Sequence, residues 1–450
     1  MTPARTCALL VAAVAAVYAS AFAGTFQFDD FRVIVDNSAV HGWSAWWASM
    51  PGIRPLLKAS YTLSWVTGGG SALAFHVPNV ALHAASACLV FELVRHWTDG
   101  SLAMPPARPV RRDGDLAVPL AVALLFALHP AQTEVVTYVS GRSSGLMATL
   151  YLASMLAWER ARAAGGGRLL GIVSLATFAA ALATKETAWT LPFALVLVEL
   201  TRNGGRLRAA GAAARAHFAL LATAALAILA LPTYRRMLAS AFALRDPVDN
   251  LVAQVSAVAY LLANPLLTLH VNIDPVVPRL TGVAWGAVAA ALVALLYVGA
   301  AGVRRGLVPG FGLLWFFLHL TPTNSLLARD DLANDRQLAL AVIGIALAYC
   351  SLIRVRLSSR AFAAVTLALA LVLGTVTALR NIDYRSEVAL WQSSLAADPR
   401  NARAWNNLGM AWRAEGRNDE ARMAFLRALE IDPAHPQALG NLLELGAALR

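Results

Sequence analysis

Uncharged apolar runs alternate with short polar segments along most of the chain. The first run, from Cys7 to Phe28, follows Arg5 and is long enough to cross about 30 Å of hydrocarbon as a helix. A removed signal peptide is the alternative for this run, because residues 21–23 also match a small-residue cleavage site. Further candidate spans begin near Leu73, Leu116, Ser144, Leu169, Thr187, Ala216, Leu251, Thr281, Gly310, Gln337 and Ala361.

The run from Leu251 to Leu269 leaves the topology open at one point. Its Asn264-Pro265 interruption allows a re-entrant or interfacial segment, whereas a full crossing would place Arg304 outside. We favour the re-entrant form, although the sequence does not decide whether the run is a full span. The pattern then predicts an all-α fold, a polytopic membrane helical bundle of about 11 spans.

Basic residues between the spans indicate which loops face the cytoplasm, because loops rich in arginine stay on the cytoplasmic side of the membrane. The residues concerned are Arg95, Arg108, Arg111, Arg112, Arg160, Arg162, Arg168, Arg202, Arg206, Arg208, Arg215, Arg304, Arg305, Arg354, Arg356 and Arg360. The intervening loops, at residues 29–70, 129–142, 184–186 and 321–336, are then expected on the opposite face. This topology places the N-terminus inside and the C-terminus outside.

After the last span the pattern changes to that of a soluble helical repeat. Residues 402–435 carry the signature positions of a tetratricopeptide repeat, with small residues where paired helices touch. These positions are Trp405, Leu408, Gly409, Trp412, Ala421, Phe425, Ala428 and Pro433. Residues 387–397 resemble the second helix of a degenerate earlier repeat, and residues 437–449 resemble a capping helix. We therefore expect a transmembrane domain at 1–380 and an α-solenoid module at 381–450, which is too short to bury a core unaided and should dock on the bundle or self-associate.

Composition and charge narrow the class further. Of the 450 residues, 58% are apolar and only 14% are charged, which is too hydrophobic for one soluble core. The net charge of +11 comes almost entirely from arginines between apolar runs, so we expect a lipid bilayer as partner and no nucleic acid. Cys7, Cys88 and Cys350 lie in apolar stretches without metal-site spacing, so neither a disulfide nor zinc is expected.

Paired carboxylates open the first external loop at Asp29 and Asp30. A carboxylate close to the bilayer is costly and tends to mark function. In a partly desolvated cleft it could take the proton of an acceptor hydroxyl during sugar transfer. The alternative is that both residues only solvate a helix end. A divalent cation at the pair stays open, although the sequence offers no complete ligand set.

Cations in the other external loops could bind the phosphate of a lipid-linked donor. Lys185 interrupts an apolar stretch as a compact charge that Glu186 could position, and Arg142 and Arg336 could hold phosphate through two hydrogen bonds each. The alternatives are that Lys185 and Glu186 only neutralise each other and that Arg336 meets lipid headgroups.

Three further residues are candidates for a supporting role. His129 and Glu134 share an external loop and could act in proton transfer or hydrogen bonding. His83 lies within the second span and could face the site, but a hydrogen-bonded interior histidine is the alternative. Arg54 and Lys58 lie near tryptophans of the first loop, which is typical of an interfacial helix.

The order and spacing of these motifs resemble those of the transmembrane and tetratricopeptide repeat-containing O-mannosyltransferases and their bacterial relatives. The matching series is Phe28-Asp29-Asp30, Asn79 to His83, His129-Pro130, Thr133-Glu134, Gly141-Arg142, Lys185-Glu186 and Asp335-Arg336, followed by the repeats. The likeness covers nearly the whole chain. Two departures concern the acceptor more than the fold: the repeat array is short, and Gln337-Leu338 replaces an expected aromatic-rich stretch.

The resemblance implies a C-type integral-membrane glycosyltransferase fold and a lipid-phosphate sugar donor. The composition is similar to that of bacterial members, for which the donor would be a polyprenyl-phosphate sugar and the location the inner membrane, with the site and repeats on the periplasmic or exterior face. The acceptor would be a protein or glycan, and the repeats would present it. Two other functions stay open: a membrane-anchored scaffold without catalysis, and a transporter of lipid-linked sugars. The identities of the sugar and acceptor, metal dependence and oligomeric state are not decided by the sequence.

Overall fold

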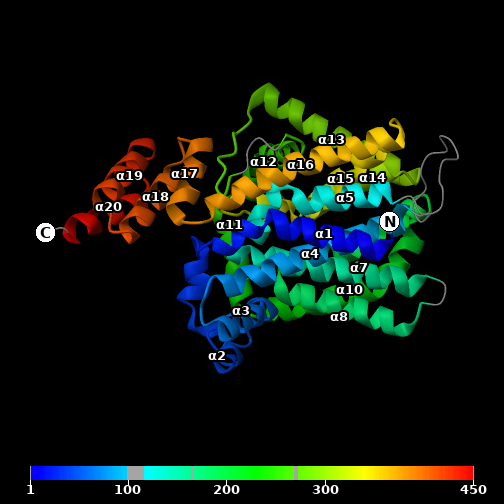
Figure 1. The fold of residues 1–450 in the computed structure, drawn as a ribbon, viewed down its shortest axis with the longest axis horizontal. Coiled ribbons are helices and arrows are strands. Elements are labelled where there is room, and N and C mark those ends of the chain that lie inside the picture. The colour runs from blue at the N-terminus through cyan, green and yellow to red at the C-terminus, as the bar shows by residue number, and fades with distance from the viewer. Residues whose placement is uncertain (1, 99–115, 164–165, 268–271, 449–450) are drawn as a thin grey trace.

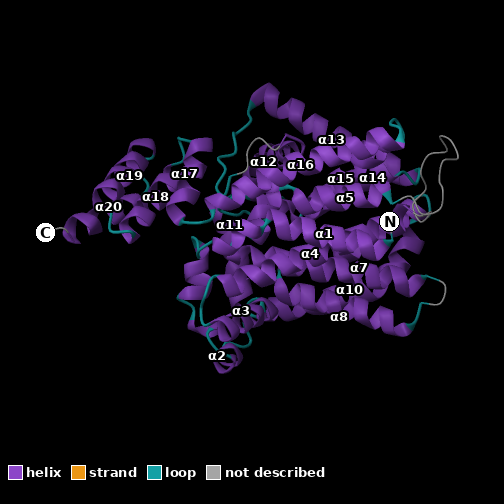
Figure 2. Ribbon diagram, viewed as in Figure 1, coloured by secondary structure: helices purple, strands orange, loops and turns teal. Residues whose placement is uncertain are grey.

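Long helices lie side by side and form the body of the protein, a bundle with its axis along the horizontal of Figure 1. The computed structural model describes residues 2–98, 116–163, 166–267 and 272–448. Within these ranges every regular element is a helix or a helical turn (Figure 2). The bundle helices are α1 (Pro3–Val17), α4 (Leu73–His96), α5 (Ala117–Leu128), α7 (Arg142–Arg162), α8 (Arg168–Thr184), α9 (Leu191–Arg202), α10 (Leu207–Ala230), α13 (Gly282–Arg304), α14 (Val308–Leu320), α15 (Leu338–Arg354) and α16 (Ser359–Asp383).

Short helices and turns connect the bundle helices at the end that carries the C-terminal module, opposite the N-terminus (Figure 1). The short helices are α2 (Trp43–Ala48), α3 (Pro55–Gly68), α6 (Thr133–Val136) and α11 (Pro232–Leu244), and the longer α12 (Pro247–Leu267) packs against α13 and α15. Single turns are η1 (Ala19–Ala23), η2 (Phe31–Val35), η3 (Ser38–Val40), η5 (Pro130–Gln132), η6 (Val139–Gly141), η7 (Glu186–Thr190) and η8 (Asp335–Gln337).

The length and composition of the helices fit an integral membrane protein. Five described helices are long and apolar enough to cross a bilayer, and a sixth crossing results if α5 and the segment Pro130–Val136, bent by 53°, form one span. Shorter apolar helices, among them α1, α8 and α14, contribute to the same bundle. The all-α membrane bundle is thus confirmed, whereas the count of about 11 spans stays a prediction. The first apolar run is helical only to Val17, after which η1 and an extended Gly24 turn the chain toward the loop.

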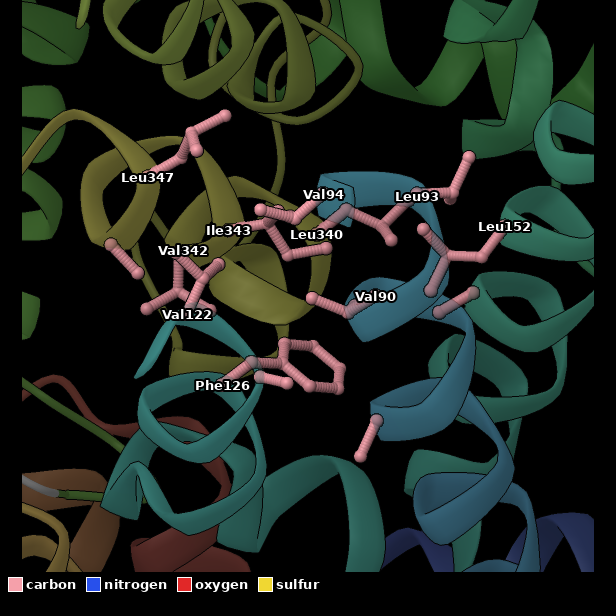
Figure 3. Close-up of a cluster of buried hydrophobic side chains, with 14 of the residues drawn as sticks. Val90, Leu93, Val94, Val122, Phe126, Leu152, Leu340, Val342, Ile343 and Leu347 are labelled. Atoms are coloured by element: carbon pink, nitrogen blue, oxygen red, sulfur yellow. The ribbon is translucent and has the colours of Figure 1, made fainter. Parts of the chain in front are cut away.

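The core of the bundle is built from apolar side chains, many of them from α4, α5, α7 and α15. Figure 3 shows Val90, Phe126, Leu152 and Ile343 among the residues that meet there. Small residues allow some helices to approach closely: a Cβ added to Gly312 would lie 2.4 Å from the carbonyl oxygen of Gly344. Such contacts are typical of helix packing in membranes, where close backbone approach replaces the hydrophobic driving force.

The arginine-rich and the polar loops separate to different ends of the bundle, as the charge pattern predicted. Near the ends of α4, α7 and α9, Arg95 pairs with Glu92 at 2.7 Å, and Arg202 pairs with Glu159 at 2.7 Å. Residues Arg108, Arg111 and Arg112 lie outside the described residues. The structure contains no membrane, so the assignment of these ends to sides stays a prediction.

The C-terminal module consists of α17 (Glu387–Ala397), α18 (Ala402–Ala414), α19 (Asn418–Ile431) and α20 (Pro436–Ala448). Helices α18 and α19 pack against each other and form the predicted repeat. A Cβ added to Gly409 would lie 2.6 Å from the ring of Phe425, so this close approach of the two helices requires a residue without a side chain. Of the two predicted alternatives the structure shows docking on the bundle, because the side chains of Trp391 and Leu408 share a buried cluster with Tyr138 from the bundle end, and self-association stays a prediction. The bundle ends at Asp383, slightly beyond the expected domain boundary at residue 380.

Candidate functional site

The two acidic residues of the first loop have different environments. Asp30 is fully buried and accepts hydrogen bonds from the backbone N–H of Gln27 (2.9 Å), the backbone N–H of Ser140 (2.7 Å) and the hydroxyl of Ser140. Burial raises the pKa of Asp30 to about 7, and these hydrogen bonds only partly offset the effect. Asp30 therefore ties the first loop to the turn at Ser140 and has no free face for a substrate.

Asp29 is the accessible carboxylate of the pair. Its side chain is 32% exposed, and its nearest cation is the exposed Arg32, at 3.6 Å. The backbone N–H of Asp29 donates to the hydroxyl of Tyr138 at 3.0 Å, which fixes the main chain beneath the carboxylate. Asp29 can therefore reach an acceptor group, whereas Asp30 holds the loop in place.

Neither Asp29 nor Asp30 is among the residues that line a cavity of about 110 Å³, which is lined instead by four cations. They come from distant parts of the sequence: Arg54 precedes α3, Lys185 follows α8, and Arg329 and Arg336 lie in the loop before α15. The other lining residues are Ser143, Ser144, Met147, Thr187, His319, Thr323, Asn334, Gln337, Ala339 and Leu340. The four predicted external loops therefore meet at one end of the bundle. Asp30 of the first loop contacts Ser140 of the second, and residues of the third and fourth loops line the same cavity as Arg54 of the first.

Two of the cations are balanced by buried or half-buried carboxylates. The guanidinium of Arg54 donates to both oxygens of Glu186, with the shortest distance 2.8 Å, and the hydroxyl of Tyr234 donates to the same carboxylate at 2.9 Å. The Nε of Arg336 lies 2.7 Å from Glu134, and its guanidinium lies over the ring of Tyr138. Glu186 and Glu134 thus position cavity arginines, and the expected pairing of Lys185 with Glu186 is replaced by an Arg54–Glu186 pair.

The other two cations have no carboxylate within ion-pair distance in the part of the chain that the structure describes. The Nζ of Lys185 donates to the hydroxyl of Ser144 at 2.6 Å, and Arg329 lies at the cavity rim. Burial and the neighbouring guanidiniums of Arg54 and Arg336 lower the pKa of Lys185 well below its usual value. Glu186 and Glu134 pair with two of the four cationic side chains, so Lys185 and Arg329 stay without a paired carboxylate within the described ranges, and a bound anion would stabilise them.

Arg142, predicted to bind phosphate, is turned away from this cavity. It is 1% exposed, and its guanidinium donates to Asn79 (2.7 Å), Ser64 (2.9 Å) and the carbonyls of Ser60 and Phe75. Its donors are used within the protein, so the geometry gives no support to the phosphate-binding role. Arg142 instead joins α3, α4 and α7 beneath the site.

Replacing Arg142 with lysine is therefore expected to destabilise the fold by about 3 kcal/mol, because an ammonium cannot satisfy these four separated acceptors. A thermal unfolding curve in detergent would show the loss, and the affinity of any remaining folded protein for a phosphate ligand should be unchanged. A variant as stable as the parent would contradict the structural role.

The predicted supporting histidines lie outside the cavity. The Nε2 of His83 is 2.9 Å from the carbonyl of Ala127, and its ring packs on Tyr18. His129 is buried and accepts a hydrogen bond from the backbone N–H of Ala131 at its Nδ1. Both contacts are those of helix-packing residues. Among the described residues no three His, Cys, Asp or Glu side chains gather as a metal site, so a divalent cation stays a prediction.

Four titratable residues at the site are not among the candidates predicted from the sequence. The sequence pattern predicts an interfacial helix around Arg54, and it gives no separate signal for Arg329, Tyr138 or His319. Tyr138 is fully buried and lies between the main chain of Asp29 and the guanidinium of Arg336. Its position inside the predicted loop at 129–142 is the only signal in the sequence that points to it.

Comparison with known proteins supports the family resemblance. The tetratricopeptide repeat family matches residues 402–435. Protein O-mannosyl-transferase TMTC3 of Mus musculus is 24% identical over 94% of this chain and 51% of its own length. Protein O-mannosyl-transferase F38B6.6 of Caenorhabditis elegans is 24% identical over 96% of this chain and 64% of its own length.

A higher identity is confined to part of the chain. Protein O-mannosyl-transferase Tmtc1 of Drosophila melanogaster is 30% identical over 42% of this chain and 22% of its own length. The chain thus spans about half the length of the mouse relative and less than two thirds of the nematode one. No solved structure matches. The predicted likeness to the O-mannosyltransferases is confirmed at the level of sequence over most of the chain.

Proposed function

We propose that this chain is an integral-membrane glycosyltransferase that moves a sugar from a polyprenyl phosphate to a hydroxyl group of a protein. The cavity of Arg54, Lys185, Arg329 and Arg336, in which two of the four cationic side chains have no paired carboxylate among the described residues, is the observation that carries the proposal. The relatives are named protein O-mannosyl-transferases, which supports mannose as the sugar and a protein as the acceptor.

Asp29 acts as the base in this scheme. Its carboxylate takes the proton of the acceptor hydroxyl while the hydroxyl oxygen forms a bond to the anomeric carbon of the sugar. The bond between that carbon and the phosphate oxygen breaks, and its electron pair stays on the phosphate. Attack opposite the leaving group inverts the anomeric configuration.

The cavity favours the transition state over the bound donor. A polyprenyl-phosphate sugar carries one negative charge on its diester, whereas the departing polyprenyl monophosphate carries up to two. Fixed cations in a partly desolvated site gain energy as that second charge develops, without having to reorganise. The two cationic side chains without a paired carboxylate in the described part of the chain, Lys185 and Arg329, can pair with the two charges of the product phosphate, and half-buried Lys185 is charged most easily when the phosphate is present.

The location of the reaction follows from the charge pattern. The repeat module lies at the end of the bundle opposite the N-terminus (Figure 1), and the loops that line the cavity connect helices at the end opposite the arginine-rich loops. By the positive-inside rule this end is the non-cytoplasmic face. For a bacterial chain the reaction would take place on the periplasmic or exterior side of the inner membrane.

The proposal is tested by following label from a donor to an acceptor. Purified protein in lipid nanodiscs is incubated with polyprenyl-phosphate mannose labelled in the sugar, together with serine- and threonine-containing peptides. We expect label in the peptide fraction, with inverted anomeric configuration. Label that stays in the lipid fraction with every peptide offered would contradict the proposed function.

The lowered pKa of Lys185 predicts a pH dependence of phosphate binding. Above about pH 7.5 a phosphate monoester is already fully ionised, because its second pKa is about 6. As the pH then rises through the lowered pKa of Lys185, the ammonium loses its proton and the affinity for polyprenyl monophosphate should fall. Titration calorimetry at increasing pH should show this fall in the parent at a lower pH than an ordinary lysine would give, and no such fall in Lys185→Met. A parent profile as flat as that of the variant would contradict the assignment.

A further inference from the structure

Phe28, directly before Asp29, has an unusual backbone conformation. Its φ is 44°, in the left-handed region that residues other than glycine rarely adopt. A bulky side chain makes this conformation costly, so surrounding contacts have to maintain it. The conformation sets the direction in which the chain enters Asp29 and therefore where the carboxylate points.

Contacts that maintain this conformation come from α17, the first helix of the repeat module. The backbone N–H of Phe28 donates to Oε1 of Glu387 at 2.7 Å. The ring of Phe28 meets the ring of Trp391 edge to face, with the centroids 5.4 Å apart. Just before α17, the carbonyl of Tyr384 accepts a hydrogen bond from the side chain of Gln27 at 3.0 Å. The repeat module thus contacts the residues on the N-terminal side of Asp29.

A second contact joins the module to the cationic side of the site. The guanidinium of Arg403, in α18, donates to Asp331 at 2.7 Å and forms a bidentate pair with Asp274. Asp331 lies between Arg329 and Arg336, the two arginines that this loop contributes to the cavity. The module therefore holds both the loop of the carboxylate and the loop of the arginines.

We infer that the repeat module is a positioning element of the reaction centre: through Glu387 and Trp391 it holds Phe28 in the left-handed conformation that aims Asp29. Glu387 does not touch the reacting atoms in this scheme and acts only through Phe28. The inference rests on the proposed function, because it assigns Asp29 its role as base. It goes further in making the repeats part of the catalytic geometry as well as a surface for an acceptor.

Substitution of Glu387 tests this role. Glu387→Ala removes the acceptor for the Phe28 N–H, so the unfavourable conformation is no longer maintained, and kcat should fall about 5- to 20-fold. Glu387→Gln keeps a side-chain oxygen that can accept the same hydrogen bond and should retain most of the activity. Gln392→Ala changes an exposed residue of the same helix and is the matched control. The KM for the donor should be unchanged in all three variants, because the cation cavity is intact.

A glycine at position 28 separates backbone positioning from general damage. Glycine adopts positive φ without steric cost, so Asp29 no longer depends on Glu387 in a Phe28→Gly background. There the added Glu387→Ala change should cost less than about 2-fold in kcat. An equal loss in both backgrounds, or a fully active Glu387→Ala single variant, would overturn the inference.

Hydrogen exchange tests the positioning without relying on activity. Peptides covering residues 24–36 should exchange faster in Glu387→Ala than in the parent and at the parent rate in Glu387→Gln and Gln392→Ala. Unchanged exchange in Glu387→Ala would overturn the positioning role even if the transferase is active. If exchange is faster in Glu387→Ala but the parent protein has no transferase activity, the contact between Glu387 and Phe28 is supported and the proposed function is contradicted.

Discussion

Replacing Asp29 with asparagine is expected to lower kcat for sugar transfer by about 100- to 10,000-fold, the usual contribution of a positioned general base. An amide has the size and shape of the carboxylate but cannot take the proton of the acceptor hydroxyl. Because Asp29 is partly exposed and has only the exposed Arg32 as an ion-pair partner, the fold should be unaffected. Rates of transfer from labelled donor, measured with melting temperatures, give both quantities.

Asp30→Asn is the matched control for this prediction. Two N–H groups and a hydroxyl point at the buried Asp30 carboxylate, and the NH2 of an asparagine would oppose one of them. This variant should therefore lose stability as well as activity. An Asp29→Asn variant with the parental kcat would contradict the role of Asp29 as the base. If in addition Asp30→Asn lost activity with unchanged stability, the roles of the two carboxylates would be reversed.

Arg336→Ala is expected to have the second large effect, because it leaves Glu134 as an unpaired carboxylate that is only 2% exposed. Loss of one partner of a buried ion pair costs about 3–5 kcal/mol. The same change removes one of four cavity cations. Both the melting temperature and kcat should therefore fall.

The double variant Arg336→Ala with Glu134→Ala separates these two effects. Removing both charges eliminates the unpaired carboxylate, so most of the lost stability should return. Activity should stay low, because the cavity still lacks the cation that faces the developing phosphate charge. A double variant with parental kcat would mean that Arg336 serves only to neutralise Glu134.

The features that the sequence predicted well are those expressed in local patterns. Apolar run length identified the membrane bundle, and the spacing of Trp405, Gly409 and Phe425 identified the repeat. The alternation of basic and polar loops correctly grouped the loops around Asp29 and Lys185 at one end. The interruption at Asn264 also has a structural counterpart, since this side chain donates to Asp335 beside the site.

Pairings between distant residues could not be predicted in the same way. Arg142 and Arg336 look alike in sequence, as basic residues next to a span, yet one is surrounded by acceptors of α3 and α4 and the other lines the cavity. Arg54 and Glu186 are separated by more than a hundred residues, so no spacing rule links them. The left-handed conformation of Phe28 likewise depends on Glu387, at the far end of the chain.

Binding of the carrier lipid tests the central claim most directly, namely that the four cations form a site for a lipid phosphate. Radiolabelled undecaprenyl monophosphate and the uncharged undecaprenol are compared in nanodiscs with the parent and with Lys185→Met and Arg329→Met. Neither variant removes the partner of a buried carboxylate. The account predicts that the parent binds the phosphate far more tightly than the alcohol and that each variant weakens only phosphate binding. Equal binding of the two lipids, or variants with parental affinity for the phosphate, would contradict it.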